Sequence, residues 1–350
     1  MKKTLIATVI GARPQFVKAG PVSRELERQG VREILINTGQ HYDPVLSDEI
    51  AGDVGLREAD LNLGVGSGSH GAQTAATLER VEHAFVDTQP TAVIVYGDTN
   101  ATIAGALAAT KLHIPVAHVE AGLRSFNRRM PEELNRVATD HLADLLLAPT
   151  QTAMVNLERE GLRSRAVLTG DVMVDALRSI PIDEIEVPAW ATGRFIAATI
   201  HRAENTDKVG RLEAILSALG GLEIPVHVLA HPRLRARIAQ HGLDPSRYRS
   251  LVLHDPIPYA QMLAVVSSAE ALLTDSGGLQ KEAFILGVPC ITLRTETEWP
   301  ETLQGDWNVV AGDDLESLAG LLARTPVQLD AAPFGDGRAA RRIVQEVLRL

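Results

Sequence analysis

The stretch AVIVYGDTNATIAGALAATKLHIPVAHVEAGLRS, residues 92–125, contains the repeating unit of the fold. Two short apolar runs, 92–97 and 115–119, enclose the segment 99–112, whose amphipathic pattern predicts a helix. A strand, a helix and a second strand in this order predict two parallel strands joined by a crossover helix. In open parallel sheets, ligands bind beyond the carboxyl ends of the strands, so the polar residues after each run are the ones to examine.

The same alternation extends over almost the whole chain. In the first half, strands are expected at 4–10, 32–37, 92–97, 115–119, 144–148 and 167–170, and helices at 16–29, 73–88, 99–112, 132–143 and 151–161. In the second half, strands are expected at 194–200, 226–230, 251–254, 271–274, 289–293 and 308–310, and helices at 207–219, 232–240, 258–269, 277–287, 313–324 and 337–350. This alternation predicts an α/β fold with parallel sheets covered by helices on both faces.

A polar, proline-containing segment near 179–193 separates the two series of strands. We therefore expect two Rossmann-like domains that face a cleft, one over 1–175 and one over 176–336, followed by a helix at 337–350. The 350 residues suffice for two such domains. Apolar residues make up 45% of the chain and charged residues 22%, which is the balance of a globular protein.

The composition excludes several classes of protein. No run approaches the ~18–20 apolar residues that a membrane span needs. The one cysteine, Cys290, excludes an internal disulfide and a cysteine-based zinc site. The net charge of −10 disfavours nucleic acids and anionic membranes as partners. The N-terminal segment is typical of a first strand rather than a signal peptide, so we expect a cytoplasmic location.

Positive charge is nevertheless concentrated near the expected strand ends of the first half. The residues concerned are Arg13, Lys18, Arg124, Arg128, Arg129 and Arg136. The turn after the first strand, 11–15, contains Arg13, and the helix that follows carries Lys18, so two cations are expected close together at the carboxyl edge. This turn does not match G-x-G-x-x-G, so it does not support a dinucleotide site.

Two carboxylates follow neighbouring expected strands. Asp98 comes after 92–97 and Glu120 comes after 115–119, so both are expected on one rim. Two carboxylates on one rim perturb each other's pKa values, which is common in acid–base sites. Aspartate is also a good N-cap residue, so Asp98 could equally have the structural role of capping the helix that follows. Glu132 lies in the first turn of the next expected helix, four residues before Arg136. This spacing is consistent with a functional site and also with an ordinary surface ion pair between the two residues.

The second half offers an anion site. In LTDSGGLQKEA, residues 273–283, a strand ends at Thr274, the two glycines after Ser276 expose backbone N–H groups, and a helix begins. Such a helix N-terminus binds anions and suits a pyrophosphate, while Glu282 is placed to accept hydrogen bonds from ribose hydroxyls. His201 and His231 each follow a strand and are expected on the same rim, with His201 the stronger candidate.

The motifs GARPQFVK (11–18), VYGDTNATIAGALAA (95–109), HVEAGLRS (118–125), MPEELNR (130–136), HRAEN (201–205) and LTDSGGLQKEA (273–283) occur in this order along nearly the whole chain. Together they resemble the non-hydrolysing UDP-N-acetylglucosamine 2-epimerases. The resemblance implies the fold of B-type glycosyltransferases, with an active site between two Rossmann-like domains. It also implies that the C-terminal helix packs back on the first domain.

The resemblance implies roles for individual residues. The catalytic candidates are Asp98, Glu120, Glu132, Lys18 and His201, and the substrate-binding candidates are Arg13, Arg136, Ser276, Gly277, Gly278 and Glu282. The candidate allosteric residues are Gln40, His41, Arg202 and His231. The implied partner is a UDP-sugar, the implied assembly is a homodimer, and no cofactor or metal is implied. The reaction expected is reversible epimerisation of UDP-GlcNAc to UDP-ManNAc through elimination and re-addition of UDP.

Some positions depart from the family pattern. Trp299 stands where family members often have arginine, and Gln40-His41-Tyr42-Asp43 stands where many bacterial members read Gln-His-Arg. With RSFNRRMPEE at 124–133, these departures also resemble the subfamily that epimerises UDP-2,3-diacetamido-glucuronate.

Other reaction classes are less well supported. A B-type glycosyltransferase would use the same Ser-Gly-Gly-Glu cradle, but three carboxylates grouped in one domain favour epimerisation. A metal-dependent hydrolase lacks a spacing such as H-E-x-x-H. A non-catalytic sensor of nucleotide sugars would bind without turnover.

Overall fold

A computed structural model describes residues 4–39, 52, 54–329 and 332–350. The chain forms two compact units, Met1–Ile180 with Ala332–Leu350, and Pro181–Ala331. The candidate allosteric residues Gln40 and His41 lie outside the described residues. No helix of the described part is long and apolar enough to cross a membrane.

The first unit is built on a seven-stranded parallel sheet with the order β3-β2-β1-β4-β5-β6-β7. Its strands are β1 (Leu5–Ile10), β2 (Arg32–Asn37), β3 (Leu61–Asn62), β4 (Ala92–Tyr96), β5 (Val116–Val119), β6 (Leu145–Ala148) and β7 (Ala166–Leu168). Its helices are α1 (Arg13–Arg28), α3 (His70–Thr88), α4 (Asn100–Lys111), α5 (Pro131–Leu142), α6 (Gln151–Arg159), α7 (Val172–Ser179) and α14 (Ala339–Val347), with a 3₁₀ turn at Arg163–Arg165.

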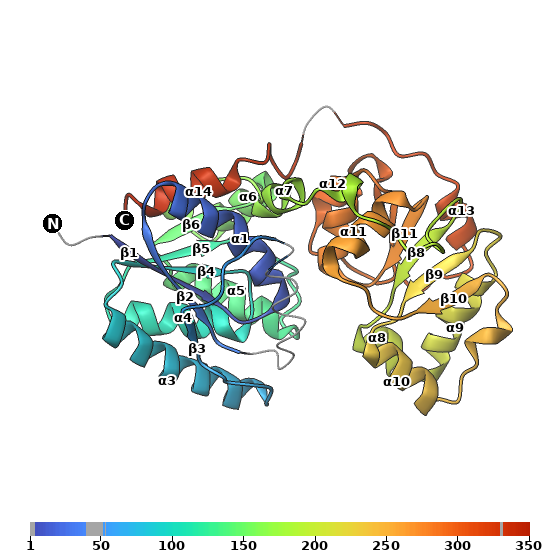
Figure 1. Ribbon diagram of the computed structural model, residues 1–350, viewed down its shortest axis with the longest axis horizontal. Helices are drawn as coiled ribbons and strands as arrows, with labels where there is room; N and C mark the ends of the chain where they lie inside the picture. The colour runs from blue at the N-terminus through green and yellow to red at the C-terminus, as the bar shows by residue number, and fades with distance from the viewer. Residues whose placement is uncertain (1–3, 40–51, 53, 330–331) are drawn as a thin grey trace. The chain divides into compact units, whose positions relative to one another are not determined.

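Helices cover both faces of this first sheet, with α1 and α14 on one face and α3 and α4 on the other (Figure 1). Every residue of β4 and β5 is buried, as the continuous apolar runs predict for central strands covered on both faces. In the register between these strands, Tyr96 is paired with Val119. The residues that follow them therefore share one edge.

The second unit contains a six-stranded parallel sheet with the order β10-β9-β8-β11-β12-β13. Its strands are β8 (Ile196–Thr199), β9 (Val226–Leu229), β10 (Leu251–His254), β11 (Ala271–Thr274), β12 (Cys290–Thr292) and β13 (Asn308–Val310). Its helices are α8 (Ala203–Thr206), α9 (Val209–Gly220), α10 (Pro232–Gln240), α11 (Tyr259–Ser268), α12 (Gly277–Leu286) and α13 (Leu318–Leu322), with 3₁₀ turns at Ile182–Glu184, Pro245–Arg247 and Pro300–Asp306.

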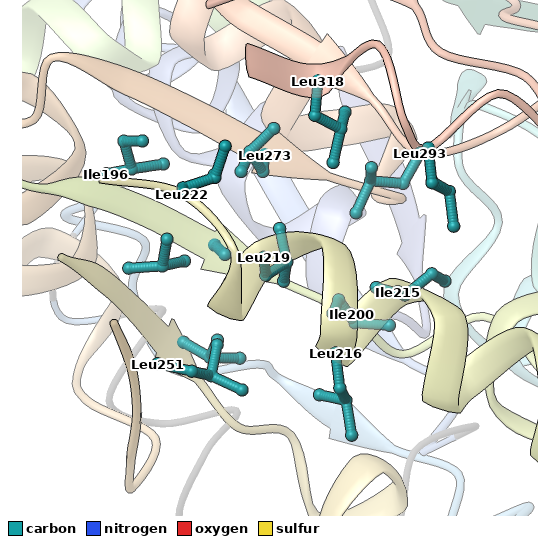
Figure 2. Packing of buried hydrophobic residues seen from close by; sticks show 14 of the residues in the cluster. Ile196, Ile200, Ile215, Leu216, Leu219, Leu222, Leu251, Leu273, Leu293 and Leu318 are labelled. Atoms are coloured by element: carbon teal, nitrogen blue, oxygen red, sulfur yellow. The ribbon is translucent and has the colours of Figure 1, made fainter. Parts of the chain in front are cut away.

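The core of the second unit joins strands to helix α9. Leu216 and Leu219 of α9 belong to one hydrophobic cluster with strand residues such as Ile196 and Leu273, and all four side chains are fully buried (Figure 2). Burying apolar side chains of this size stabilises a fold by about 1.5–3 kcal/mol each. The parallel pairing of Thr274 in β11 with Thr199 in β8 places the carboxyl ends of these two strands side by side.

The expected architecture of two parallel sheets with interleaved helices is confirmed. The unit boundaries differ by five residues from the expected ones, because residue 175 lies inside α7. Helix α7 buries an apolar face that includes Val172 and Leu177, and it packs against α1 and α14 of the first unit. The short strand β3 and helix α8 were not expected, since two to four residues carry too little periodicity to be recognised.

Candidate active site

The rim of the first sheet is formed where β4 and β5 end. Gly97 follows β4 and its N–H donates to the carbonyl of Val119 at 3.0 Å. Gly97 has φ +61° and Glu120 has φ +71°, so both residues occupy the left-handed region. For glutamate this conformation costs energy, and strained residues of this kind cluster at functional sites. The backbone at this rim therefore differs from that of ordinary strand ends, because residues after two adjacent strands both have the left-handed conformation.

Glu120 forms a buried ion pair with Lys18 of α1. The start of α1 is held by Gln15, whose side-chain oxygen accepts from the N–H groups of Gly11 at 2.8 Å and Ala12 at 3.0 Å. The Gln15 amide also donates to the carbonyl of Tyr96 at 2.8 Å. These contacts attach the first loop to β4 and place Lys18 at the rim. Arg13 begins α1, and its side chain lies outside the described part of the structure.

Asp98 is paired with Arg136 of α5. The Nε of Arg136 lies 3.1 Å from Oδ2 of Asp98, and a second guanidinium nitrogen donates to the same oxygen. Burial raises the pKa of Asp98, and the neighbouring Glu120 adds to the increase, while Arg136 and Lys18 oppose it. The Asn135 amide donates to the Asp98 carbonyl at 3.0 Å, which fixes the backbone as well. A carboxyl with a raised pKa beside cations suits proton transfer.

The two glutamates at the start of α5 differ in environment. Glu132 is exposed and makes no ion pair with the described residues, so the plain pair with Arg136 considered for it is not formed. Glu133 is buried and accepts from the N–H groups of Ser125 at 2.9 Å and Phe126 at 3.0 Å. It also pairs with Arg136 at 3.0 Å. Glu133 thus holds both the basic loop before α5 and the partner of Asp98.

Sequence reasoning missed Glu133, although its spacing of three residues from Arg136 was a usable signal. It also counted Arg124 among the cations free for a ligand. The structure corrects this expectation, because Arg124 is buried and pairs with Asp140 at 2.7 Å and Glu160 at 2.7 Å. Arg128 and Arg129 of the same loop are exposed.

An open hollow of about 470 Å³ lies next to the rim. It is lined by residues near the N-terminal ends of three helices, namely His70, Gly71, Thr74, Ala75, Asn100, Pro131, Leu134 and Asn135. Asn100 donates to the side chain of Gln73 at 2.8 Å and accepts from Asn135 at 3.2 Å. The wall of this hollow is therefore connected to Asp98 through Asn135.

In the second unit, Asp275 organises the loop after β8. Its buried carboxylate accepts from the N–H groups of His201 at 3.0 Å and Arg202 at 2.9 Å, and from the Asn205 amide at 3.1 Å. It also lies 3.0 Å from Nδ1 of His201. Although burial alone would raise the pKa of Asp275, the hydrogen bonds and charge of His201 and the other donors lower it. The Nδ1 contact leaves Nε2 as the ring nitrogen of His201 that can meet a ligand.

His231 is the N-cap of α10, and its Nδ1 accepts from the N–H of Arg233 at 3.2 Å. Its ring lies 5.8 Å from the ring of His201. Arg202, also a candidate allosteric residue, lies 3.9 Å from Glu298. His201, Arg202 and His231 are therefore grouped at the rim of the second sheet.

Helix α12 begins directly after this rim. Ser276 is its N-cap, and the hydroxyl accepts from the N–H of Leu279 at 3.4 Å. A Cβ atom on Gly278 would meet nothing closer than 3.9 Å, so its backbone faces open space. Glu282 is buried and accepts from the hydroxyl of Tyr259 at 2.7 Å. Tyr259 is a site residue that sequence reasoning missed, because nothing in its local pattern relates it to Glu282.

Each unit thus holds its own set of groups: paired carboxylates and cations at the rim of the first sheet, and an amide-rich helix start with histidines in the second. Among the residues described, no three His, Cys, Asp or Glu side chains are grouped as metal ligands. Two Rossmann-like units that carry these features define the class as GT-B-like nucleotide-sugar proteins.

Comparison with known proteins identifies the family within this class. The family model described as UDP-N-acetylglucosamine 2-epimerase matches residues 24–348. The chain belongs to this family, whose members are isomerases.

Three similar proteins illustrate the match. A UDP-N-acetylglucosamine 2-epimerase homolog from Methanococcus maripaludis is 43% identical over 98% of this chain and 99% of its own length. The UDP-2,3-diacetamido-2,3-dideoxy-D-glucuronate 2-epimerase of Pseudomonas aeruginosa is 43% identical over 99% of each. The crystal structure of the Methanocaldococcus jannaschii UDP-GlcNAc 2-epimerase in complex with UDP-GlcNAc and UDP has a TM-score of 0.91 at 38% identity, covering 99% of this chain and 100% of that one.

Proposed function

We propose that this protein interconverts UDP-GlcNAc and UDP-ManNAc by inverting the configuration at C2 of the sugar. The observation that carries the proposal is the rim where Asp98, paired with Arg136, lies beside the buried pair of Glu120 and Lys18. This arrangement holds carboxylates and cations together within a chain of the epimerase family.

The chemistry explains why such groups are needed. The C2 hydrogen is not next to a carbonyl group, so it is not acidic in the substrate. Breaking the anomeric C–O bond produces an oxocarbenium-like centre, which makes the C2 hydrogen removable. Loss of that proton gives 2-acetamidoglucal and UDP, and re-addition of UDP with a proton on the opposite face completes the inversion. Cations must stabilise the departing diphosphate, and acid–base groups must reach both faces of C2.

The residues divide between these tasks. Asp98, with its raised pKa, and Glu120 are the acid–base candidates at the rim, and Glu132 adds an exposed carboxylate one helix away. Lys18, Arg13 and Arg136 supply positive charge. In the second unit, the amides of Ser276, Gly277 and Gly278 are assigned to the diphosphate, Glu282 to the ribose and Nε2 of His201 to the diphosphate or sugar.

A second substrate is favoured by one observation. The relative from Pseudomonas aeruginosa that is named for UDP-2,3-diacetamido-2,3-dideoxy-D-glucuronate is 43% identical, whereas the relative from Methanocaldococcus jannaschii named for UDP-N-acetylglucosamine is 38% identical. The diacetamido-uronate is therefore the alternative substrate for the same reaction.

The test is incubation with each UDP-sugar in D₂O, followed by proton NMR. We expect the C2 proton signal to disappear by exchange while both C2 epimers accumulate, without added NAD and in the presence of EDTA. Faster exchange with the diacetamido-uronate would assign that substrate instead. A glycosyltransferase would leave the C2 configuration untouched in the absence of an acceptor, and that result would overturn the proposal.

The family resemblance further supports a homodimer and a cytoplasmic enzyme, and we include both in the proposal. Light scattering coupled to gel filtration tests the first, with twice the 37.7 kDa chain mass expected. Activation of turnover by UDP-GlcNAc would support an allosteric role for one or more of the residues Gln40, His41, Arg202 and His231.

A further inference from the structure

His118 is a fully buried histidine of β5 to which the proposed chemistry assigns no part. Its Nδ1 lies 2.7 Å from Oδ1 of Asp140, and its Nε2 lies 2.7 Å from the carbonyl oxygen of Gly97. The ring therefore spans the space between α5 and the peptide that leads into Asp98. Both contacts have the length of good hydrogen bonds.

Both partners of the ring are hydrogen-bond acceptors. The carbonyl of Gly97 can only accept, so Nε2 carries a hydrogen. The other oxygen of Asp140 accepts from Gly122 N–H at 3.0 Å and pairs with Arg124 at 2.7 Å. Although burial alone would raise the pKa of Asp140, the hydrogen bonds and charges of His118 and Arg124 lower it. The contacts with the Gly122 N–H and the Arg124 guanidinium, which do not depend on the state of His118, identify Asp140 as a carboxylate, so Nδ1 must also carry a hydrogen.

The charges around the ring lead to the same conclusion. Arg124 is shared between two carboxylates, Asp140 and Glu160. A single guanidinium leaves this cluster one negative charge in excess, and a positive His118 makes it neutral. The charged groups near the cluster are the pair of Lys18 and Glu120, Arg136 with both Asp98 and Glu133, and His141, which lies 3.4 Å from Glu160. Buried charges persist only when paired in this way.

We propose that His118 is a positioning residue, protonated on both ring nitrogens, that fixes the peptide between Gly97 and Asp98 by binding the Gly97 carbonyl and the Asp140 carboxylate at once. The inference rests on the proposed function, because its consequence is the orientation of Asp98. Because the His118 side chain is fully buried, this charge acts on the rim through the Gly97 carbonyl and not by contact with substrate. Gly97 lies beyond the end of β4 in a left-handed conformation, and this ring binds its carbonyl there.

Two substitutions separate the contacts of the ring. An asparagine side chain at position 118 is too short to reach the position of Nε2 but places its amide where Nδ1 lies, so His118→Asn keeps the contact with Asp140. The longer side chain in His118→Gln reaches toward the Gly97 carbonyl and gives up the contact with Asp140. We expect His118→Asn to lose some melting temperature, because it leaves the cluster one negative charge in excess, and to lose about 10–100-fold in kcat with little change in KM, since small misplacements of catalytic groups cost this much. We expect His118→Gln to lose melting temperature but keep more of kcat.

The protonation state is measured independently of activity. In protein labelled with ¹⁵N at histidine, both ring nitrogens of His118 should show the chemical shift and the one-bond hydrogen coupling of protonated nitrogens at pH 7. The His118→Gln spectrum assigns the signals. One unprotonated ring nitrogen would overturn the inference, as would equal kcat per folded molecule in both variants and the wild type. Absence of any C2 exchange in the wild type would instead overturn the proposed function and leave the NMR result standing.

Discussion

Gly97 and Glu120 meet at the rim of the first sheet so closely that a Cβ atom on Gly97 would lie 3.2 Å from Oε2 of Glu120. Both residues have left-handed backbone, at the ends of adjacent strands. The space that a side chain would occupy at position 97 is taken by the carboxylate and, at 3.7 Å, by the ammonium group of Lys18. Glycine at this position is therefore a requirement of the ion pair as well as of the turn.

Replacing Gly97 by alanine should damage the site more than the fold. The added methyl group must displace Glu120 or Lys18, and alanine at φ +61° adds about 1–2 kcal/mol of backbone strain. We expect Gly97→Ala to lose at least about tenfold in kcat, because catalytic groups are sensitive to small displacements. Gly30→Ala is the control, since Gly30 has φ +68° and nothing within 4 Å of its Cβ position. Equal kcat in the two variants would contradict the role given to Gly97.

Much of the fold could be predicted because burial leaves a direct pattern in the sequence. The run AVIVY of β4 is apolar at every position, which is how a strand covered on both faces reads. Successive parallel strands then place Asp98 and Glu120 on one rim, and the register of Tyr96 with Val119 agrees with that placement.

The remainder of the site depends on contacts between distant residues, which local patterns do not encode. The left-handed conformation of Glu120 follows from the packing of the rim and from no preference of glutamate. The sequence also did not reveal which of Glu132 and Glu133 contacts Arg136, because two adjacent glutamates point in different directions on a helix. Only the structure shows that Glu133 is the one bound to Arg136 and to the preceding loop.

The three candidate carboxylates can be tested by neutral substitutions. Asp98→Asn, Glu120→Gln and Glu132→Gln should each lose at least about a hundredfold in kcat, which is the usual cost of losing acid–base help. Glu132 gives the cleanest test, because it is exposed and makes no ion pair with the described residues, so its melting temperature should not change. Steady-state assays and thermal denaturation measure the two effects.

The matched control for this series is Glu158→Gln, which neutralises another exposed helical glutamate away from the rim. It should leave both kcat and melting temperature unchanged. If any two of the three site variants kept near-normal turnover, the catalytic assignment would lose its support.

The start of α12 should bind the diphosphate through its backbone. A Cβ on Gly277 would lie 2.1 Å from Glu298 Oε1, so Gly277→Ala must move Glu298, which pairs with Arg294 at 2.8 Å. A Cβ on Gly278 meets no atom closer than 3.9 Å, so Gly278→Ala changes only the space open to a ligand. We expect both variants to bind UDP at least several-fold more weakly in calorimetry, because bare amides at a helix start need close approach of the anion.

Gly210→Ala serves as the control for the glycine pair, since Gly210 lies in α9 and has nothing within 4 Å of its Cβ position. Its affinity for UDP should equal that of the wild type. Unchanged affinity in both α12 variants would place the diphosphate elsewhere.

The second unit should lose stability in mild acid because of two histidines. Nδ1 of His227 lies 2.7 Å from Nε2 of His254, and Trp190 stacks on His254 with 3.8 Å between ring centroids. Burial lowers the pKa of His227 from its ordinary value of 6.5, and burial together with His227 and Arg235 lowers the pKa of His254. Below 6.5 the unfolded chain therefore binds more protons than the folded one, so the free energy of unfolding decreases as the pH falls toward the folded-state values.

His254→Phe keeps a ring on Trp190 and removes one titrating group and the hydrogen bond between the imidazoles. We expect the melting temperature of the wild type to fall more between about pH 7.5 and about pH 5.5 than that of His254→Phe. His83→Gln, at an exposed position on α3, should reproduce the wild-type pH dependence. If His254→Phe lost as many degrees over this range as the wild type, the two histidines would not be the groups that make the second unit sensitive to acid.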